Sequence, residues 1–330
     1  MTDGSRQRRP RVLMVSRYFW PLGCFDGAVH LMAIARGLSE CGFHVDVLTP
    51  KYHTEWAESF RFRDISVYRP VRAPKVGWKK AFDRGTTRYI DFLTQWLLSH
   101  GGGYDVLYCD SAREEAISTV AAAKELGLKC MVRVAGLGTA SDLEWMNSSR
   151  FGKRIVGALS LADLVVVGDA DAERSWHTFG IRGPKLARIR SGVYPSELED
   201  KQDLRSAFAR INGDLFVPSG SQVALSVERH DASSGVMQLA NAAVGLSREA
   251  PSLHYWFVGD GANRDAVYSR LRGDGLRQSF VMPGSFGLIQ DVFQAADFLI
   301  QTGEAGFDAL VPAAIEAGLP IVLANNAAAR

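Results

Sequence analysis

The chain has 330 residues, of which 47% are hydrophobic and 22% are charged. This composition is typical of a folded globular protein and excludes a disordered or fibrous one, and the length favours two domains. No apolar run approaches the roughly 20 residues of a membrane-spanning helix. Four cysteines without metal-type spacing indicate reduced thiols in a cytosol: Cys24, Cys41, Cys109 and Cys130.

The net charge of +2 is unevenly distributed, with +8 on the first 195 residues and −6 on the rest. A basic first half suits an anionic partner, such as a membrane surface or a phosphorylated acceptor. Opposite charges equally help two halves of a protein to dock. We therefore expect a cytoplasmic protein, and peripheral contact with the inner face of a membrane stays open.

The first half alternates strands and helices. The basic residues 1–10 read as a disordered tail, followed by a buried strand over 11–16, a loop over 17–27 and a helix from about 28 to 41. Such a unit places its loop at the carboxyl end of the first strand, where doubly wound folds bind ligands. Further strands are predicted at 45–49, 61–72, 104–110, 130–134, 162–168 and 184–189, with helices over 75–98 and 114–126.

A polar, proline-bounded segment over 196–218 reads as a linker containing a short helix near 201–211. It separates a first domain over 11–195 from a second over 219–330. The second domain shows the same alternation, with strands predicted at 222–227, 254–261, 280–284, 297–300 and 321–324. The fold class is therefore α/β, with two doubly wound Rossmann-like domains.

The segment from Gly303 to Val322 reads as a glycine loop, a short helix and a buried strand. Such a loop directs backbone N–H groups and the positive end of a helix dipole toward one point, which typically holds a phosphate. No Gly-x-Gly-x-x-Gly follows any strand, which argues against a dinucleotide oxidoreductase. The sequence contains neither a Walker phosphate loop nor a metal-ligand cluster.

Gly306-Phe307 and Gly318-Leu319-Pro320 fix the register in which this segment resembles retaining glycosyltransferases of family 4, or group 1 type. The resemblance implies a GT-B fold, in which two Rossmann-like domains face each other across a cleft. It also implies sugar transfer with retention from a nucleotide-diphosphate sugar, without a metal or another cofactor. Because family members continue beyond the position of Arg330, we expect the second domain to be incomplete or the chain to be a fragment.

The resemblance also implies a donor site in the second half. Arg229 and Gly235 match a phosphate-binding loop in which Ser234 replaces a lysine, and the helix beginning near Gly306 supplies further N–H groups. The two glutamates of the family fall on Ala305 and Ala313 in this chain. Glu304 and Glu316 lie close to these positions and also read as surface residues. The donor-site candidates are Arg229, Ser234, Gly235, Gly259, Asp260, Gly261, Glu304, Gly306, Phe307 and Glu316.

On the acceptor side, the paired glycines of the family fall on Phe25 and Asp26. Ala135 replaces a histidine that contacts the sugar in many relatives. His30 reads equally as a structural residue, and Arg133 as half of a salt bridge under a loop. The acceptor-side candidates are Gly23, Asp26, Gly27, His30, Arg133 and Gly136.

We therefore expect a hexosyltransferase of cell envelope polysaccharide biosynthesis whose catalytic residues the sequence does not identify. Its partners would be a nucleotide sugar and an acceptor that is a glycan, a lipid-linked molecule or a small molecule, and not a nucleic acid. One alternative is a catalytically inactive relative that serves as a binding or scaffold protein. It is favoured by the replacements Ala135, Ser234, Ala305 and Ala313. A third reading is a sugar-nucleotide epimerase.

Overall fold

The computed structural model describes residues 8–74, 79–136, 141–179, 181, 185–195, 197–231, 234–273, 279–326 and 329, with the backbone alone for 79–83. Contacts divide these residues into two compact units. The first holds residues up to Tyr18, Leu31–Ala135 and Ser141–Arg190, and the second holds Phe19–His30, Gly136 and residues from Ser191 on. Most of the predicted tail, the start of the predicted helix over 75–98 and Pro184 lie outside the described residues.

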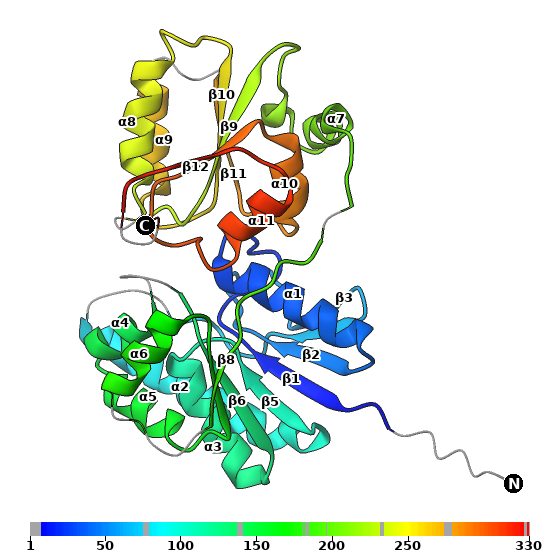
Figure 1. The fold of residues 1–330 in the computed structure, drawn as a ribbon, viewed down its shortest axis with the longest axis vertical. Coiled ribbons are helices and arrows are strands. Elements are labelled where there is room, and N and C mark those ends of the chain that lie inside the picture. The colour runs from blue at the N-terminus through cyan, green and yellow to red at the C-terminus, as the bar shows by residue number, and fades with distance from the viewer. Residues whose placement is uncertain are drawn as a thin grey trace, which may run out of the picture. The chain divides into compact units, whose positions relative to one another are not determined.

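The first unit is built on an eight-stranded sheet in which every neighbouring pair is parallel except β3 with β4. In spatial order its strands are β3 (Ser59–Phe62), β4 (Ile65–Tyr68), β2 (His44–Leu48), β1 (Arg11–Val15), β5 (Val106–Cys109), β6 (Lys129–Val134), β7 (Leu164–Val167) and β8 (Lys185–Arg188). Figure 1 shows this sheet in blue to green. The near-continuous apolar runs of its central strands are typical of a sheet covered on both faces.

Buried side chains of five helices form the main core of the first unit with alternate residues of the central strands, such as Leu13 and Val15. Three of these helices are α2 (Lys79–His100), α3 (Glu114–Leu126) and α5 (Gly152–Leu159). Helix α1 (Asp26–Glu40) contributes its first five residues to the second unit. The unit is completed by α4 (Asp142–Ser148) and α6 (Ala170–Thr178).

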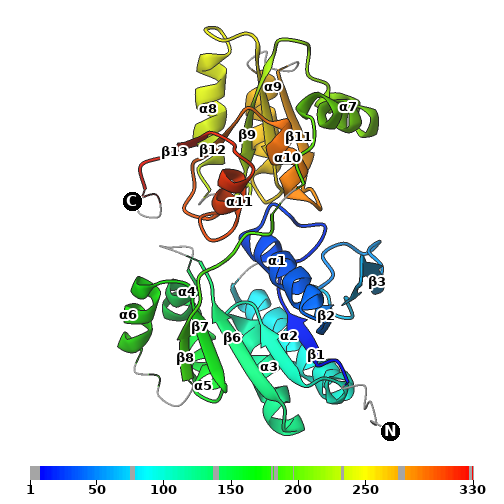
Figure 2. The same ribbon diagram turned by 45° about the vertical axis from the view of Figure 1, so that its right-hand side comes forward.

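The second unit has a fully parallel five-stranded sheet, seen in Figures 1 and 2 between two layers of helices. Its strands, in spatial order, are β11 (Phe280–Gly284), β10 (Leu253–Val258), β9 (Gln222–Val227), β12 (Phe298–Gln301) and β13 (Ile321–Leu323). The helices are α7 (Lys201–Ile211), α8 (Val236–Leu246), α9 (Arg264–Gly273), α10 (Ile289–Ala295) and α11 (Leu310–Glu316).

Alternation along β9 determines which helices cover which face of this sheet. Val223, Leu225 and Val227 pack with buried residues of α7, α10 and α11, whereas Ala224 packs with α8 and α9. Because successive strand residues point to opposite faces, a single apolar strand supports both layers. The prediction of two Rossmann-like α/β domains is confirmed.

Two differences from the predicted elements have local causes. The segment predicted as one strand with turns over 61–72 is the antiparallel pair β3 and β4, which turns at Arg63 with a φ of 53°. Helix α4 was not predicted, because its seven residues make too few turns to show a periodic pattern. Helix α7, predicted inside the linker, belongs to the second unit.

A buried ion pair holds α7 on the second unit. The Arg205 guanidinium is almost fully buried and donates to Asp297 at 2.6 Å and to the Ala295 carbonyl at 2.8 Å. The Asp297 carboxylate also accepts from the Val223 backbone N–H at 2.7 Å, at the start of β9. One carboxylate therefore connects α7, the β9 start and the α10–β12 turn.

We predict that Asp297→Asn lowers the free energy of unfolding by about 3 kcal/mol, because it leaves the buried Arg205 without a counter-charge. Burial alone would raise the pKa of Asp297, but the hydrogen bonds from Val223, Lys201 and Arg205 lower it overall. This stabilisation is present above the unfolded-state pKa near 4 and is lost as pH falls further. Urea unfolding measures it. Asp203→Asn changes an exposed residue of α7 and should leave the free energy of unfolding within about 0.5 kcal/mol of the wild-type value. Equal losses of stability in both variants would contradict the prediction.

Candidate functional site

The loops at the carboxyl edge of the second sheet meet one another, as parallel strands require. The loop after β9 begins with Glu228, the loop after β10 is Gly259-Asp260-Gly261, and the loop after β12 begins with Thr302. The backbone N–H of His230 donates to the Asp260 carbonyl at 3.0 Å. The Thr302 hydroxyl oxygen lies 3.0 Å from the Ser234 carbonyl oxygen. The sequence-predicted donor candidates at these positions therefore lie on three connected loops.

Glycine is required at two of these positions because two loops cross in contact. Gly259 has a φ of +145°, and a Cβ placed there would lie 1.9 Å from the Glu228 carbonyl oxygen. Gly261 has a φ of +159°, and its Cβ would lie 2.4 Å from the His230 carbonyl oxygen. The Gly-Asp-Gly motif thus supports the β9 loop, and Asp260 is exposed between the two glycines.

The predicted phosphate-binding loop contains one half-exposed cation. Arg229 is 46% exposed, its Nε lies 3.2 Å from the Asp231 carboxylate, and its guanidinium lies 5.8 Å from the Phe25 ring. Ser234 is buried, and its hydroxyl donates to the Asp231 carbonyl at 3.0 Å. Gly235 takes the left-handed conformation, with a φ of +73°, at the start of the eleven-residue helix α8. Arg229 is thus the exposed charged group of this loop.

Two titratable groups at the end of β9 are buried, and their pKa values shift in opposite directions. Burial raises the pKa of Glu228 to about 7, although the hydroxyls of Thr302 and Ser226 lower it. Burial and the nearby Arg264 lower the pKa of His230 to about 4. Both groups are therefore largely neutral in slightly acidic solution.

The N–H groups at the start of α11 bind a carboxylate. Asp26 accepts from the backbone N–H of Gly306 at 2.7 Å, of Ala309 and Leu310 at 2.9 Å, and of Asp308 at 3.4 Å. These N–H groups include the one at Gly306 that the sequence assigns to a phosphate. A phosphate would therefore have to displace Asp26 to use them.

Asp26 has a second carboxylate as its neighbour. Asp308 accepts from the Ser191 hydroxyl at 2.7 Å and from the backbone N–H of Gly136 at 3.3 Å. Burial and the charge of Asp308 raise the pKa of Asp26, while the N–H groups of Leu310, Ala309 and Gly306 oppose that shift. The two acids thus connect residues from four parts of the sequence within the second unit.

The remaining donor candidates differ in their surroundings. Glu304 and Phe307 are half-buried on the β12–α11 loop, near the exposed Ala305. Ala313 is fully buried in the core, whereas Glu316 is exposed at the opposite end of α11 from Gly306. The helix thus turns Glu316 toward solvent and the Ala313 position toward the core.

The acceptor-side loop is held by backbone contacts of the second unit. The N–H of Gly23 donates to the Phe286 carbonyl at 2.7 Å, and a Cβ at Gly23 would lie 2.4 Å from that oxygen. Gly27 is half-buried in the first turn of α1, and His30 is buried further along the same helix. Asp26 and Gly136 both contact the β12–α11 region, so the structure groups these two acceptor candidates with donor candidates.

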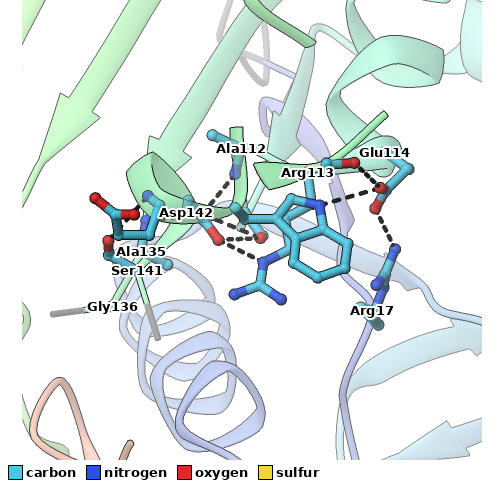
Figure 3. Close-up of polar contacts among 12 residues, drawn as sticks. Arg17, Ala112, Arg113, Glu114, Ala135, Gly136, Ser141 and Asp142 are labelled. Atoms are coloured by element: carbon cyan, nitrogen blue, oxygen red, sulfur yellow. Dashed lines mark hydrogen bonds and ion pairs between the residues drawn. The ribbon is translucent and has the colours of Figure 1, made fainter. Parts of the chain in front are cut away.

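In the first unit, Asp142 joins the loops after β5 and β6 (Figure 3). Its carboxylate accepts from the backbone N–H of Ala112 at 2.7 Å, from that of Ala135 at 2.9 Å and from the Arg113 guanidinium at 2.7 Å. The Ser111 hydroxyl adds two contacts of 3.1 Å. Ala135, at which the resemblance described above expects a histidine, therefore takes part through its backbone.

A largely buried cluster of Arg17, Glu114 and Glu115 lies at the start of α3, and Figure 3 shows its Arg17–Glu114 contact. Arg17 donates to Glu114 and Glu115 at 2.8 Å each, and Glu114 also accepts from the Trp145 indole at 3.0 Å. Burial alone would lower the pKa of Arg17, but Glu115 and Glu114 raise it well above its usual range. Arg133 is buried in β6 with a terminal nitrogen 3.9 Å from Asp110, which fits the salt-bridge reading.

Sequence reasoning missed the buried acids Glu228 and Glu114 and the half-buried Asp308. Each lies directly after a strand, or near the start of a helix, at the carboxyl edge of its sheet. Their position at the carboxyl edge was the signal that could have identified them. It was missed because acidic residues at helix starts are usually solvent-exposed caps. Their burial depends on contacts between loops distant in sequence.

We predict that Gly259→Ala lowers the free energy of unfolding by about 3 kcal/mol or more, because its Cβ would overlap the Glu228 carbonyl at an unfavourable φ. Gly245→Ala is the matched control, since a Cβ in this part of α8 meets nothing within 4 Å. It should stabilise by up to about 1 kcal/mol. Denaturant titration of both variants tests the prediction, and a loss at Gly259 no larger than at Gly245 would refute it.

We also predict a pH-dependent effect of Glu228→Gln. Between pH 4.5 and 7 the native protein keeps a proton on Glu228 that the unfolded chain has lost, so wild-type stability falls with rising pH from this group. His230 has the opposite effect up to about pH 6.5. The stability of the variant minus that of the wild type should therefore grow by up to about 3 kcal/mol from pH 4.5 to 7. Urea unfolding at a series of pH values measures this difference. A constant difference between the two proteins from pH 4.5 to 7 would contradict the prediction.

Comparison with known proteins identifies the family. A family model described as Glycosyl transferase 4-like domain matches residues 27–192, which is half of the chain. A search of curated proteins by sequence found no match.

Within the described residues, no helix has both the length and the apolar character needed to cross a bilayer.

Several solved structures share the fold. A UDP-forming α,α-trehalose-phosphate synthase from Burkholderia xenovorans, in complex with glucose-6-phosphate, has a TM-score of 0.64 at 14% identity, covering 95% of this chain and 84% of that one. HepE from Anabaena, in complex with UDP-glucose, has a TM-score of 0.63 at 15% identity, covering 97% and 81%. Sucrose-phosphate synthase from Thermosynechococcus elongatus has a TM-score of 0.60 at 14% identity, covering 96% and 81%. The fold is thus that of the GT-B glycosyltransferases, and from the span of the family match the chain belongs to the glycosyl transferase 4-like family.

Proposed function

We propose that this protein transfers a sugar from a UDP-sugar to an acceptor, with retention at the anomeric carbon. The observation that carries the proposal is the half-exposed Arg229 on the loop that leads from β9 into α8. A guanidinium beside the N-terminus of an eleven-residue helix suits a diphosphate. The complex of HepE with UDP-glucose supports the choice of nucleotide.

In this proposal the donor diphosphate lies against Arg229 and the first N–H groups of α8, and Gly259–Gly261 supports the loop that carries Arg229. Electrostatic stabilisation of the departing diphosphate is the main contribution to the rate. Ser234 offers a hydroxyl where the family has a lysine, so one fixed cation acts in place of two. Loss of one such contact typically lowers a rate by about a hundredfold.

The acceptor is proposed to bind the first unit, which carries the excess of positive charge, and a glycan, a lipid-linked molecule and a small molecule remain the candidates. We propose a reaction without a metal, in which the leaving phosphate assists deprotonation of the acceptor hydroxyl. A role in cell envelope polysaccharide synthesis and contact with a membrane surface belong to the proposal as well.

A second candidate function is nucleotide-sugar binding without turnover. It is favoured by the Asp26 carboxylate, which accepts hydrogen bonds from four N–H groups at the start of α11. The alanines at 135, 305 and 313 also remove side chains that the family uses near the donor. The two candidates share the Arg229 site and differ in catalysis.

We predict that UDP-glucose binds and is slowly hydrolysed to UDP and glucose, and that Arg229→Ala weakens binding by about tenfold or more. Calorimetry over a panel of nucleoside diphosphates and nucleotide sugars measures binding, and UDP release measures turnover. Arg248→Ala, an exposed change at the far end of α8, is the matched control and should bind as the wild type does. Binding without UDP release favours the second candidate, and a panel without any binding ligand refutes both.

A further inference from the structure

Glu228 connects two of the loops that carry donor candidates. Its Oε1 accepts from the Thr302 hydroxyl at 2.6 Å and from the Ser226 hydroxyl at 3.1 Å. The Thr302 hydroxyl also lies 3.0 Å from the Ser234 carbonyl, directly before Gly235 and α8. A chain of short contacts thus runs from the end of β9 through the β12 loop to the start of α8.

The loops pack tightly around this carboxyl group. A Cβ at Gly303 would lie 3.0 Å from Glu228 Oε2 and 2.9 Å from the Ser234 carbonyl oxygen. A Cβ at Gly235 would lie 2.8 Å from the Thr302 hydroxyl. Glu228 is 3% exposed, and Oε2 has no well-formed hydrogen bond among the described residues. The backbone N–H of Gly303 lowers the pKa of this carboxyl, but burial outweighs it. A negative charge here would therefore be poorly solvated.

The charged surroundings do not compensate an ionised Glu228. Asp231 acts on it with the same sign and is paired with Arg229 at 3.2 Å. His230 is neutral above about pH 5, and Asp260 and Arg264 act on His230. On the β12 loop the nearest acid in sequence is Glu304. Burial without a counter-charge therefore gives Glu228 a pKa of about 7 in the free protein.

We propose that Glu228 is a positioning residue that takes up one proton from solvent when a nucleotide diphosphate binds beside Arg229 and α8. The inference rests on the proposed function and adds how its donor site is regulated. Two phosphate charges near an ionised Glu228 would repel it, so binding favours the neutral carboxyl. The neutral carboxyl still accepts from Thr302 through Oε1, so the loops stay joined, and the proton returns to solvent on release.

The test is the pH dependence of UDP-glucose binding, because the phosphodiester groups of this probe do not titrate near neutral pH. Between pH 6 and 8 the wild-type Kd should rise several-fold, up to about tenfold. Glu228→Gln keeps the acceptor oxygen and removes the titration, so its Kd should stay constant near the wild-type value at pH 6. The matched control Glu249→Gln, an exposed glutamate of the same unit, should follow the wild type.

Proton uptake gives a second measurement that needs no variant. Calorimetry at pH 7 in two buffers of different ionisation enthalpy should show uptake of a fraction of a proton per UDP-glucose bound. If Glu228 had only a structural role, Glu228→Gln would bind UDP-glucose more weakly than the wild type. Its proton uptake and the pH dependence of its Kd would equal those of the wild type. Binding with no uptake, or with equal slopes in wild type and Glu228→Gln, overturns this inference alone; absence of binding overturns the proposed function with it.

Discussion

Buried and half-buried carboxylates that collect backbone N–H groups hold the loops of this protein in place. Asp142 binds N–H groups after β5 and β6, and Asp297 binds the N–H at the start of β9. Asp26 does the same at the start of α11. Strand ends and helix starts leave such donors unpaired, and an ionised acceptor makes the stronger kind of hydrogen bond. The geometry of both carboxyl edges depends on these acids.

The same arrangement limits what the loops can bind. N–H groups that could hold a phosphate at Gly306 already hold Asp26, and Asp308 adds a second negative charge. A ligand there must displace a carboxylate, which costs the hydrogen bonds that the carboxylate makes. The N-terminus of α8 differs, because its side-chain contact is a long one, from the Val236 N–H to the Ser234 hydroxyl at 3.4 Å, and Arg229 lies on the preceding loop. This contrast is why the proposed diphosphate site is placed at α8.

The order of elements was predictable from the sequence because the apolar runs are short and end at polar residues, glycine or proline. Helix α7 matched its predicted span, and the β9 and β11 strands matched theirs. The contacts of Asp26 with Gly306 and of Glu228 with Thr302 were not predictable, since they join residues more than 70 positions apart along the chain. A local pattern reports capping and periodicity, and it carries no information on which distant loop covers a carboxylate.

The charge of the second unit explains why protonation matters to its proposed function. Residues 196–330 carry a net charge of −6, and Asp231 already pairs with the half-exposed Arg229. A diphosphate that approaches this edge gains one guanidinium and one helix dipole, and it meets the fields of Asp231 and Glu228. Neutralising Glu228 removes one of these opposing charges without breaking the Thr302 contact that joins the loops. A buried carboxylic acid without a counter-charge destabilises the fold once it ionises. The same burial lets it take up a proton near neutral pH, which favours the binding of an anion.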